Sequence, residues 1–156
     1  GLAMPVIAFL RGFLAAYRSP LSLVVRLHPV YDRDATNYQA AFEGDKRVTV
    51  QRADEAPWTH EQLAISDLHI SVFSACHYDS MGMGTPTAVL ALPGHHIVSD
   101  LVSSGMAELV QSPVELAALV EARAFKAAPE AMSQSLYRPG FAANIRALLE
   151  TLDASK

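Results

Sequence analysis

The sequence predicts an α/β fold in which an open, parallel sheet of about five strands lies between two layers of helices, as a three-layer sandwich. Short β-branched segments alternate with helix-length segments, and a helix separates nearly every pair of consecutive strands. Parallel neighbours need such long crossovers, whereas antiparallel strands can be joined by tight turns. The 156 residues fit a single domain, 1–156, and 51% hydrophobic residues supply enough apolar surface for its core.

The predicted strands are short and rich in β-branched residues. Residues 21–27 are apolar almost throughout, which is typical of a strand buried on both faces. Four further strands are expected at residues 48–50, 68–73, 87–92 and 107–110.

Helices are expected between these strands and at both ends of the chain. The predicted ranges are 4–17, 34–42, a short segment from 59, 77–83, 97–104, 113 to about 126, and 141 to about 152. In the last helix, Ile145, Leu148, Leu149 and Leu152 fall on one stripe.

Several helix boundaries carry recognisable capping residues. Asp34 is a predicted N-cap, and two capping boxes are predicted, one from Thr59 to Gln62 and one from Ser112 to Glu115. Gly84 and Gly105 are placed to end the helices before them, because glycine readily adopts the left-handed conformation that closes a helix.

Composition excludes several classes of protein. With 12 Lys and Arg against 16 Asp and Glu, and no basic run, the chain lacks the cationic surface that nucleic-acid binding needs. Its one cysteine, Cys76, cannot form an internal disulfide. The apolar segment 2–16 contains Arg11 and falls short of the ~20 residues of a membrane span. It also lacks the basic start of a signal peptide, so we expect a cytoplasmic protein.

The first predicted helix, 4–17, has apolar residues on more than one face. Ile7 and Phe9 lie outside the main stripe, and a helix that covers one sheet face needs only one stripe. We therefore expect these two side chains to contact a missing domain or a second copy of the chain. A chain that opens on a helix also leads us to expect that it is one half of a larger protein.

Polar residues gather where three predicted strands end. In open parallel sheets, ligands bind beyond the carboxyl ends of the strands. The loops 26–29, 73–77 and 92–96 follow three of them and hold four histidines and a serine, namely His28, His77, His95, His96 and Ser74. The sequence therefore predicts a ligand site along this edge.

Residues 65–87, ISDLHISVFSACHYDSMGMGTPT, resemble a recurrent pattern of GT-B glycosyltransferases: an aspartate, a strand, a short Ser-rich loop, an acidic residue, a turn and Gly-x-Pro-Thr. Upstream, Arg26-Leu27-His28-Pro29 resembles the His-Pro motif of bacterial capsule and sialic-acid transferases and of polyol-phosphate transferases. Downstream, Ser104-Gly105-Met106-Ala107 is similar to the Gly-x-Ala turn of the same domains. The resemblance covers roughly residues 21–126 and implies a Rossmann-like domain.

The resemblance implies a function and a set of binding residues. The chain would be the nucleotide-binding C-terminal half of a transferase for a surface polysaccharide, with a nucleotide-activated sugar or polyol as its donor. The donor phosphates would contact His28, Pro29 and the loop Ser74, Ala75, Cys76 and His77, and Asp79 would bind the ribose. Trp58, Gly94 and His95 would lie near the base or the donor. The catalytic base would belong to an N-terminal half, and the rest of the protein could place it at a membrane surface.

Two residues depart from the family pattern. Asp79 stands where a glutamate usually holds the ribose hydroxyls, and Ala75 replaces a second Ser or Gly of the phosphate loop. Neither change abolishes binding, because backbone N–H groups supply most of the contacts to a phosphate at such a loop.

Structural roles are open for the same residues. Ser74 could simply cap a helix, His28 could end a strand before Pro29, and Asp79 could be a surface residue. Cys76 is better read as a small packed residue than as a nucleophile. Zinc needs three or four converging ligands, so we expect no metal at His95 and His96.

The remaining alternatives concern Trp58 and the function itself. Trp58 could stack on a nucleobase, but packing at the edge of the core is the favoured role. A non-catalytic module of the same ancestry, used in assembly or glycan export, is the second reading, and Ala75 and Asp79 favour it. A flavodoxin-like signalling domain ranks last, because 26–29 lacks the acidic cluster that it would need. No cofactor is predicted.

Overall fold

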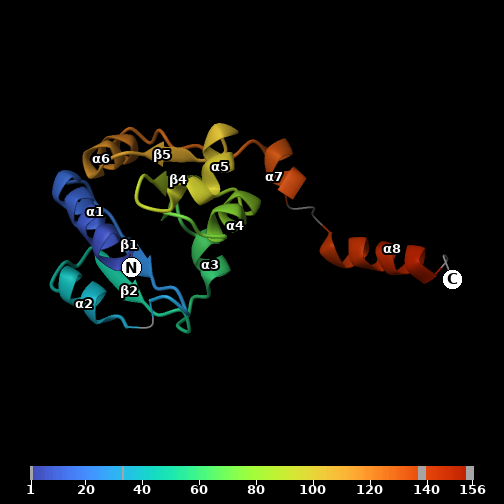
Figure 1. Cartoon of the computed structure of the whole chain (residues 1–156), viewed down its shortest axis with the longest axis horizontal. Helices are drawn as coiled ribbons and strands as arrows, with labels where there is room; N and C mark the ends of the chain where they lie inside the picture. The colour runs from blue at the N-terminus through green and yellow to red at the C-terminus, as the bar shows by residue number, and fades with distance from the viewer. Residues whose placement is uncertain (1, 33, 137–139, 154–156) are drawn as a thin grey trace.

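The computed structural model describes residues 2–32, 34–136 and 140–153 (Figure 1). Its strands are β1 (Leu23–Arg26), β2 (Val48–Gln51), β3 (His69–Ser71), β4 (Thr87–Leu90) and β5 (Glu108–Val110). Its helices are α1 (Ala3–Ala16), α2 (Thr36–Phe42), α3 (Thr59–Ala64), α4 (Cys76–Gly82), the 3-10 helix η1 (His95–Val98), α5 (Ser99–Ser103), α6 (Pro113–Glu121), α7 (Glu130–Leu136) and α8 (Phe141–Asp153). The fold is α/β, as predicted.

All strand pairs are parallel, but they form two small sheets. β1 pairs with β2, and β3, β4 and β5 form a second sheet in that order. The prediction of one sheet of about five strands is therefore wrong in this respect. The strands are only three or four residues long, so each ladder is short, and the two sheets meet through side chains of a shared core.

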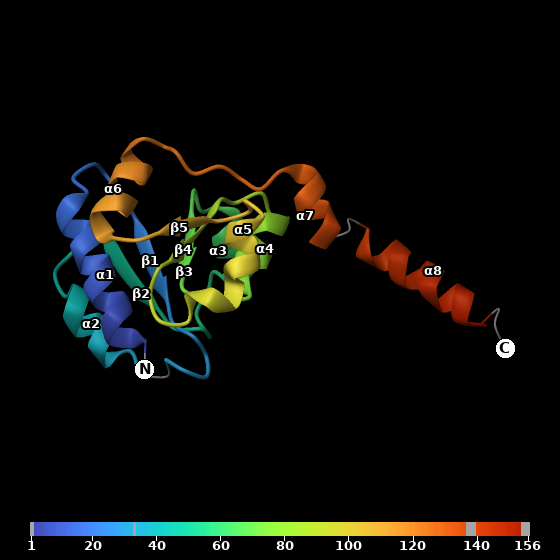
Figure 2. The ribbon, with the colours of Figure 1, turned by 45° about the horizontal axis from the view of Figure 1, so that its top comes forward.

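Helices cover both faces of the three-stranded sheet. Side chains of a strand alternate between its faces, and β4 follows this rule. Leu90 packs in the larger core with Phe13 of α1, whereas Val89 packs in a second cluster with Met81 of α4 and Leu101 of α5. Helices therefore lie around this small parallel sheet (Figure 2).

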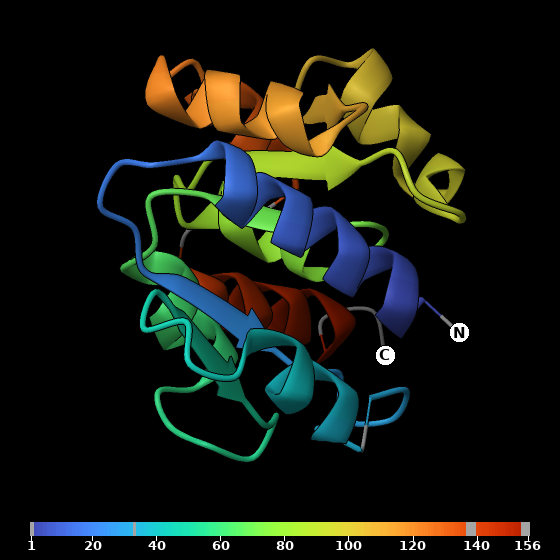
Figure 3. The same ribbon diagram turned by 90° about the vertical axis from the view of Figure 1, so that its left-hand side faces the viewer.

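Helix α1 is enclosed on several sides. It packs against both α2 and α6 and lies across the strands (Figure 3). Ile7 is 3% exposed and Phe9 is 6% exposed, so the expectation that they contact an absent partner is wrong. The second apolar face of this helix is explained by the neighbouring helices of the same chain.

The start of α3 differs by one residue from the prediction. Thr59 is the first helical residue, and Trp58 holds the N-cap position. The Glu61 carboxylate accepts a hydrogen bond from the Trp58 N–H at 2.8 Å. Thr59 and Gln62 therefore do not form the predicted capping box, because the helix begins one residue earlier than that box requires.

The C-terminal third agrees with the prediction only in part. Ser112 caps α6, its hydroxyl accepting from the Glu115 N–H at 3.2 Å, but the helix ends at Glu121 and not near residue 126. Helix α7 was not predicted, whereas α8 covers the expected range. In Figures 1 and 2, α8 lies apart from the rest of the chain. No helix among the described residues is both long and apolar enough to span a membrane.

Candidate functional site at the carboxyl ends of the strands

The three predicted loops start from one shared core. Leu27 and Val72 are buried, Leu92 is partly buried, and all three belong to the larger core cluster. His28 follows the first of these residues and Phe73 follows the second. The core thus anchors the beginning of each loop.

His28 is exposed, and its ring orientation is held by its own loop. The Nδ1 atom accepts hydrogen bonds from the N–H groups of Val30 at 3.1 Å and Tyr31 at 3.2 Å. The ring also lies against the Tyr31 ring, with 4.6 Å between centroids. Because Nδ1 accepts, the neutral ring carries its proton on Nε2, which can donate to a ligand. Pro29 is exposed beside it.

The loop after β3 uses Ser74 to start α4. The Ser74 hydroxyl accepts from the Cys76 N–H at 3.1 Å, and the Ser74 carbonyl accepts from the His77 N–H at 3.1 Å. These bonds give Ser74 the capping role that was its structural alternative. Its hydroxyl hydrogen remains available, and so are the N–H groups of Ser74 and Ala75, which donate to no group in the described part of the chain.

His77 points into the protein and away from this loop surface. Its Nδ1 lies 2.6 Å from the Thr87 hydroxyl, and the His69 Nδ1 lies 2.8 Å from the same oxygen. A hydroxyl donates one hydrogen, so Thr87 can donate to only one of the two rings. The His77 side chain is fully buried and cannot touch a ligand in this conformation.

Burial keeps both of these rings neutral. Removal from water lowers the pKa of His77 to about 4. Burial, together with the neighbouring His77, lowers the pKa of His69 to about 3. The His77 Nε2 atom is buried with no hydrogen-bond partner. The cluster joins β3, β4 and α4, so its role is to position α4 against the sheet.

The loop after β4 contacts the loop after β3. Gly94 has a φ of +100°, and a Cβ atom there would lie 2.5 Å from the Phe73 ring. Only glycine allows this close approach. The His95 Nδ1 lies 3.0 Å from the Leu92 carbonyl oxygen, which holds the ring against its own turn.

Asp79 and Trp58 lie on α4 and at the start of α3. The Asp79 carboxylate is 3.6 Å from His60 Nε2, which links the two helices. Trp58 is 57% exposed, so the favoured reading that it packs at the core edge is wrong. The Cys76 thiol is free and half-buried. No cluster able to hold a metal ion occurs within residues 2–32, 34–136 and 140–153.

Arg26 is a residue whose role was not predicted from the sequence. Its guanidinium donates to the carbonyl oxygens of Pro57 at 2.8 Å, Ala53 at 2.9 Å and Glu55 at 2.9 Å. It thereby shapes the loop that leads to Trp58. A lone arginine at the end of an apolar strand was the available signal, but its partners lie on a loop whose path the sequence does not reveal.

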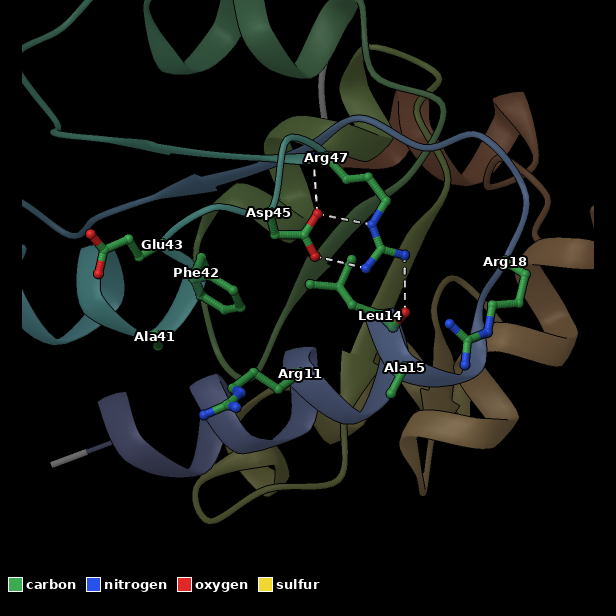
Figure 4. A pocket seen from close by; sticks show the side chains of 9 residues that line it. All are labelled: Arg11, Leu14, Ala15, Arg18, Ala41, Phe42, Glu43, Asp45 and Arg47. Carbon is green, nitrogen blue, oxygen red and sulfur yellow. Dashed lines mark hydrogen bonds and ion pairs between the residues drawn. The ribbon is translucent and has the colours of Figure 1, made fainter.

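A hollow of about 300 Å³ lies away from these residues, at the start of β2 (Figure 4). Its lining residues are Arg11, Leu14, Ala15, Arg18, Ala41, Phe42, Glu43, Asp45 and Arg47. Arg47 pairs with Asp45 at 2.7 Å and donates to the carbonyls of Leu14 and Tyr17. These hydrogen bonds satisfy carbonyl groups at the end of α1, so Arg47 has a structural role. None of the predicted site residues lines this hollow.

The geometry at the carboxyl ends therefore divides the predicted residues into two groups. His28, Ser74 and Ala75 present uncommitted hydrogen-bond donors, whereas His77 is used inside the protein. Comparisons with protein-family models, with curated proteins and with solved structures found no significant match to this chain.

Proposed function

We propose that this chain is the donor-nucleotide-binding domain of a GT-B-type glycosyltransferase, or of a polyol-phosphate transferase, that acts in surface polysaccharide synthesis. The donor is a nucleotide-activated sugar or polyol, and an N-terminal half supplies the catalytic base. The proposal rests on the motif resemblance over residues 21–126 and on the geometry of His28.

The geometry of His28 is the observation that carries the proposal. Its Nδ1 atom accepts from two backbone N–H groups and the residue is exposed, which leaves Nε2 to donate to a ligand. An N–H donor held in a fixed orientation can bind a phosphate oxygen. Tyr31, which lies against the ring and is 82% exposed, offers an aromatic surface beside it.

The loop at Ser74 supplies further donors of the same kind. The Ser74 hydroxyl and two backbone N–H groups are free to bind phosphate oxygens. Leu27 and Val72, which precede the loops of His28 and Ser74, belong to one core.

Nucleotide titration tests the proposal. Adding CMP, CDP or UDP to the chain should shift the amide NMR signals of residues 28–31 and 74–76. His28→Ala and Ser74→Ala should each weaken binding with the fold retained. Ser74→Ala should also lower the melting temperature slightly, because the Cys76 N–H at the start of α4 loses its acceptor. Gln39→Ala, at an exposed position of α2 outside the proposed site, is the control. Failure of all three nucleotides to bind, or an equal loss of stability in both variants, would contradict the proposal.

The second candidate is a non-catalytic module of the same ancestry, used in assembly or glycan export. It is favoured by Asp79, whose carboxylate lies 3.6 Å from His60 Nε2. It predicts no nucleotide-dependent change at residues 28 or 74, so the same titration separates the two candidates.

A further inference from the structure

Helix α8 exposes an apolar stripe that nothing in the described chain covers. Five large apolar side chains on this helix are 41–76% exposed, namely Phe141, Ile145, Leu148, Leu149 and Leu152. An isolated helix of 13 residues is marginal in water, and most helices are stabilised by packing an apolar face. A partner for this stripe is therefore needed.

The charges of α8 indicate what kind of partner it is. Arg146 and Glu150 lie on the side of the helix opposite the stripe, and they are the charged residues among the side chains of α8 that the structure describes. Helices that lie on membranes are usually rich in Lys and Arg. Neutral residues such as Asn144 and Thr151 flank the stripe, so two copies of this chain would approach without charge repulsion at that edge.

The same chain has an apolar groove that α8 could occupy in a second copy. The groove has a volume of about 360 Å³ and lies between the end of α1 and α6. Its apolar lining consists of Ala16, Tyr17, Ala117, Ala118 and Val114, the last of which is 67% exposed, and Arg18, Ser19 and Glu121 complete the lining. Small residues allow a helix to approach closely. In Figure 1, α8 lies at one end of the long axis, and α1 and α6, which carry the groove, lie toward the other end.

We propose that two copies of this chain form a symmetric dimer in which the α8 stripe of each packs into the α1–α6 groove of the other. A twofold axis across the long axis of the molecule brings each helix to the opposite groove, and such an exchange is closed. The stripe alone offers roughly 500 Å² if each large side chain contributes about 200 Å² when fully exposed. Stable interfaces bury about 800 Å² per partner, so the groove is needed as well as the helix.

Light scattering on the full chain tests the dimer directly. At about 50 µM we expect a particle of twice 16.8 kDa. Leu148→Ser with Leu152→Ser should yield monomer, and so should Ala118→Glu, which places a charge in the groove at an exposed position. Arg146→Gln with Glu150→Gln, on the opposite face of α8, should leave the dimer intact. Circular dichroism should show each variant folded.

Each other outcome overturns the proposal. A monomeric wild-type chain would assign the stripe to a different occupant. Loss of the dimer in the Leu variant but not in Ala118→Glu would indicate pairing of two α8 helices. A mixture of the Leu variant with Ala118→Glu should form a heterodimer, because one intact helix then meets one intact groove. Failure of this mixture to form a heterodimer would also overturn the proposal. The proposal does not depend on nucleotide binding, so the two can fail separately.

Discussion

Acid should destabilise this protein through the fully buried His77 and the half-buried His69 well before its carboxylates are protonated. His77 and His69 share the Thr87 hydroxyl between β3, β4 and α4, and burial holds the pKa of His77 at about 4 and that of His69 at about 3. In the unfolded chain both rings titrate near 6.5. Below that pH the unfolded state binds more protons than the folded state, so the free energy of unfolding falls as pH falls.

The size of the effect follows from these values. With an unfolded pKa of 6.5 and a folded pKa of about 4, His77 lowers the free energy of unfolding by roughly 2 kcal/mol between pH 7 and pH 5. His69 adds a similar amount, because its folded pKa is lower still. The loss ends near the folded pKa values. Arg47 lowers the pKa of its partner Asp45 to about 2. The contribution of Asp45 to the free energy of unfolding is therefore lost only below about pH 4, outside the range from pH 7 to pH 5.

Urea unfolding monitored by circular dichroism at pH 7, 6 and 5 measures this slope. His77→Gln should reduce it by about half, because one of two titrating rings is gone. His96→Gln, at an exposed position, should leave the slope unchanged. A free energy of unfolding that stays constant from pH 7 to pH 5 would refute the reasoning, as would an undiminished slope in His77→Gln.

Three further predictions concern stability. Gly94→Ala should lower the melting temperature, because the added Cβ would lie 2.5 Å from the Phe73 ring and the φ of residue 94 is +100°. Adding Phe73→Ala to this variant should recover part of the lost stability. If it recovers none, the cost comes from backbone strain alone. Arg47→Met should fray the end of α1, seen as faster amide exchange there, since Leu14 and Tyr17 lose a donor. Leu116→Ala, at a fully buried position, should cost 2–5 kcal/mol in urea unfolding, about the usual range for core truncation. Unchanged amide exchange in Arg47→Met, or an unchanged free energy of unfolding in Leu116→Ala, would contradict the corresponding prediction.

Local patterns in the sequence determine the elements of this fold. The apolar run at 21–27, the Ser112 cap and the positive-φ glycines Gly84 and Gly105 place β1, α6 and the ends of two helices close to where they are found. These features depend on neighbours a few residues apart, which the sequence displays directly.

The arrangement of those elements depends on contacts between distant segments. The division of the strands into two sheets, the burial of Ile7 and Phe9, and the turning of His77 toward Thr87 were not visible in the sequence. An apolar stripe on a helix indicates that its side chains will be covered, but it does not indicate which segment will cover them. For α1 the cover comes from α2 and α6 of the same chain, and for α8 no described residue provides it.

The same distinction between local pattern and tertiary structure applies to the candidate site. The sequence by itself placed His28 and Ser74 at the ends of strands, because strand ends follow from local pattern. Which of their atoms remain free to bind a ligand was decided only by the tertiary structure. The backbone of Val30 and Tyr31 occupies one nitrogen of His28, and the N–H of Cys76 occupies one acceptor of Ser74. A hydrogen bond has a direction and a partner, and only the folded chain specifies both.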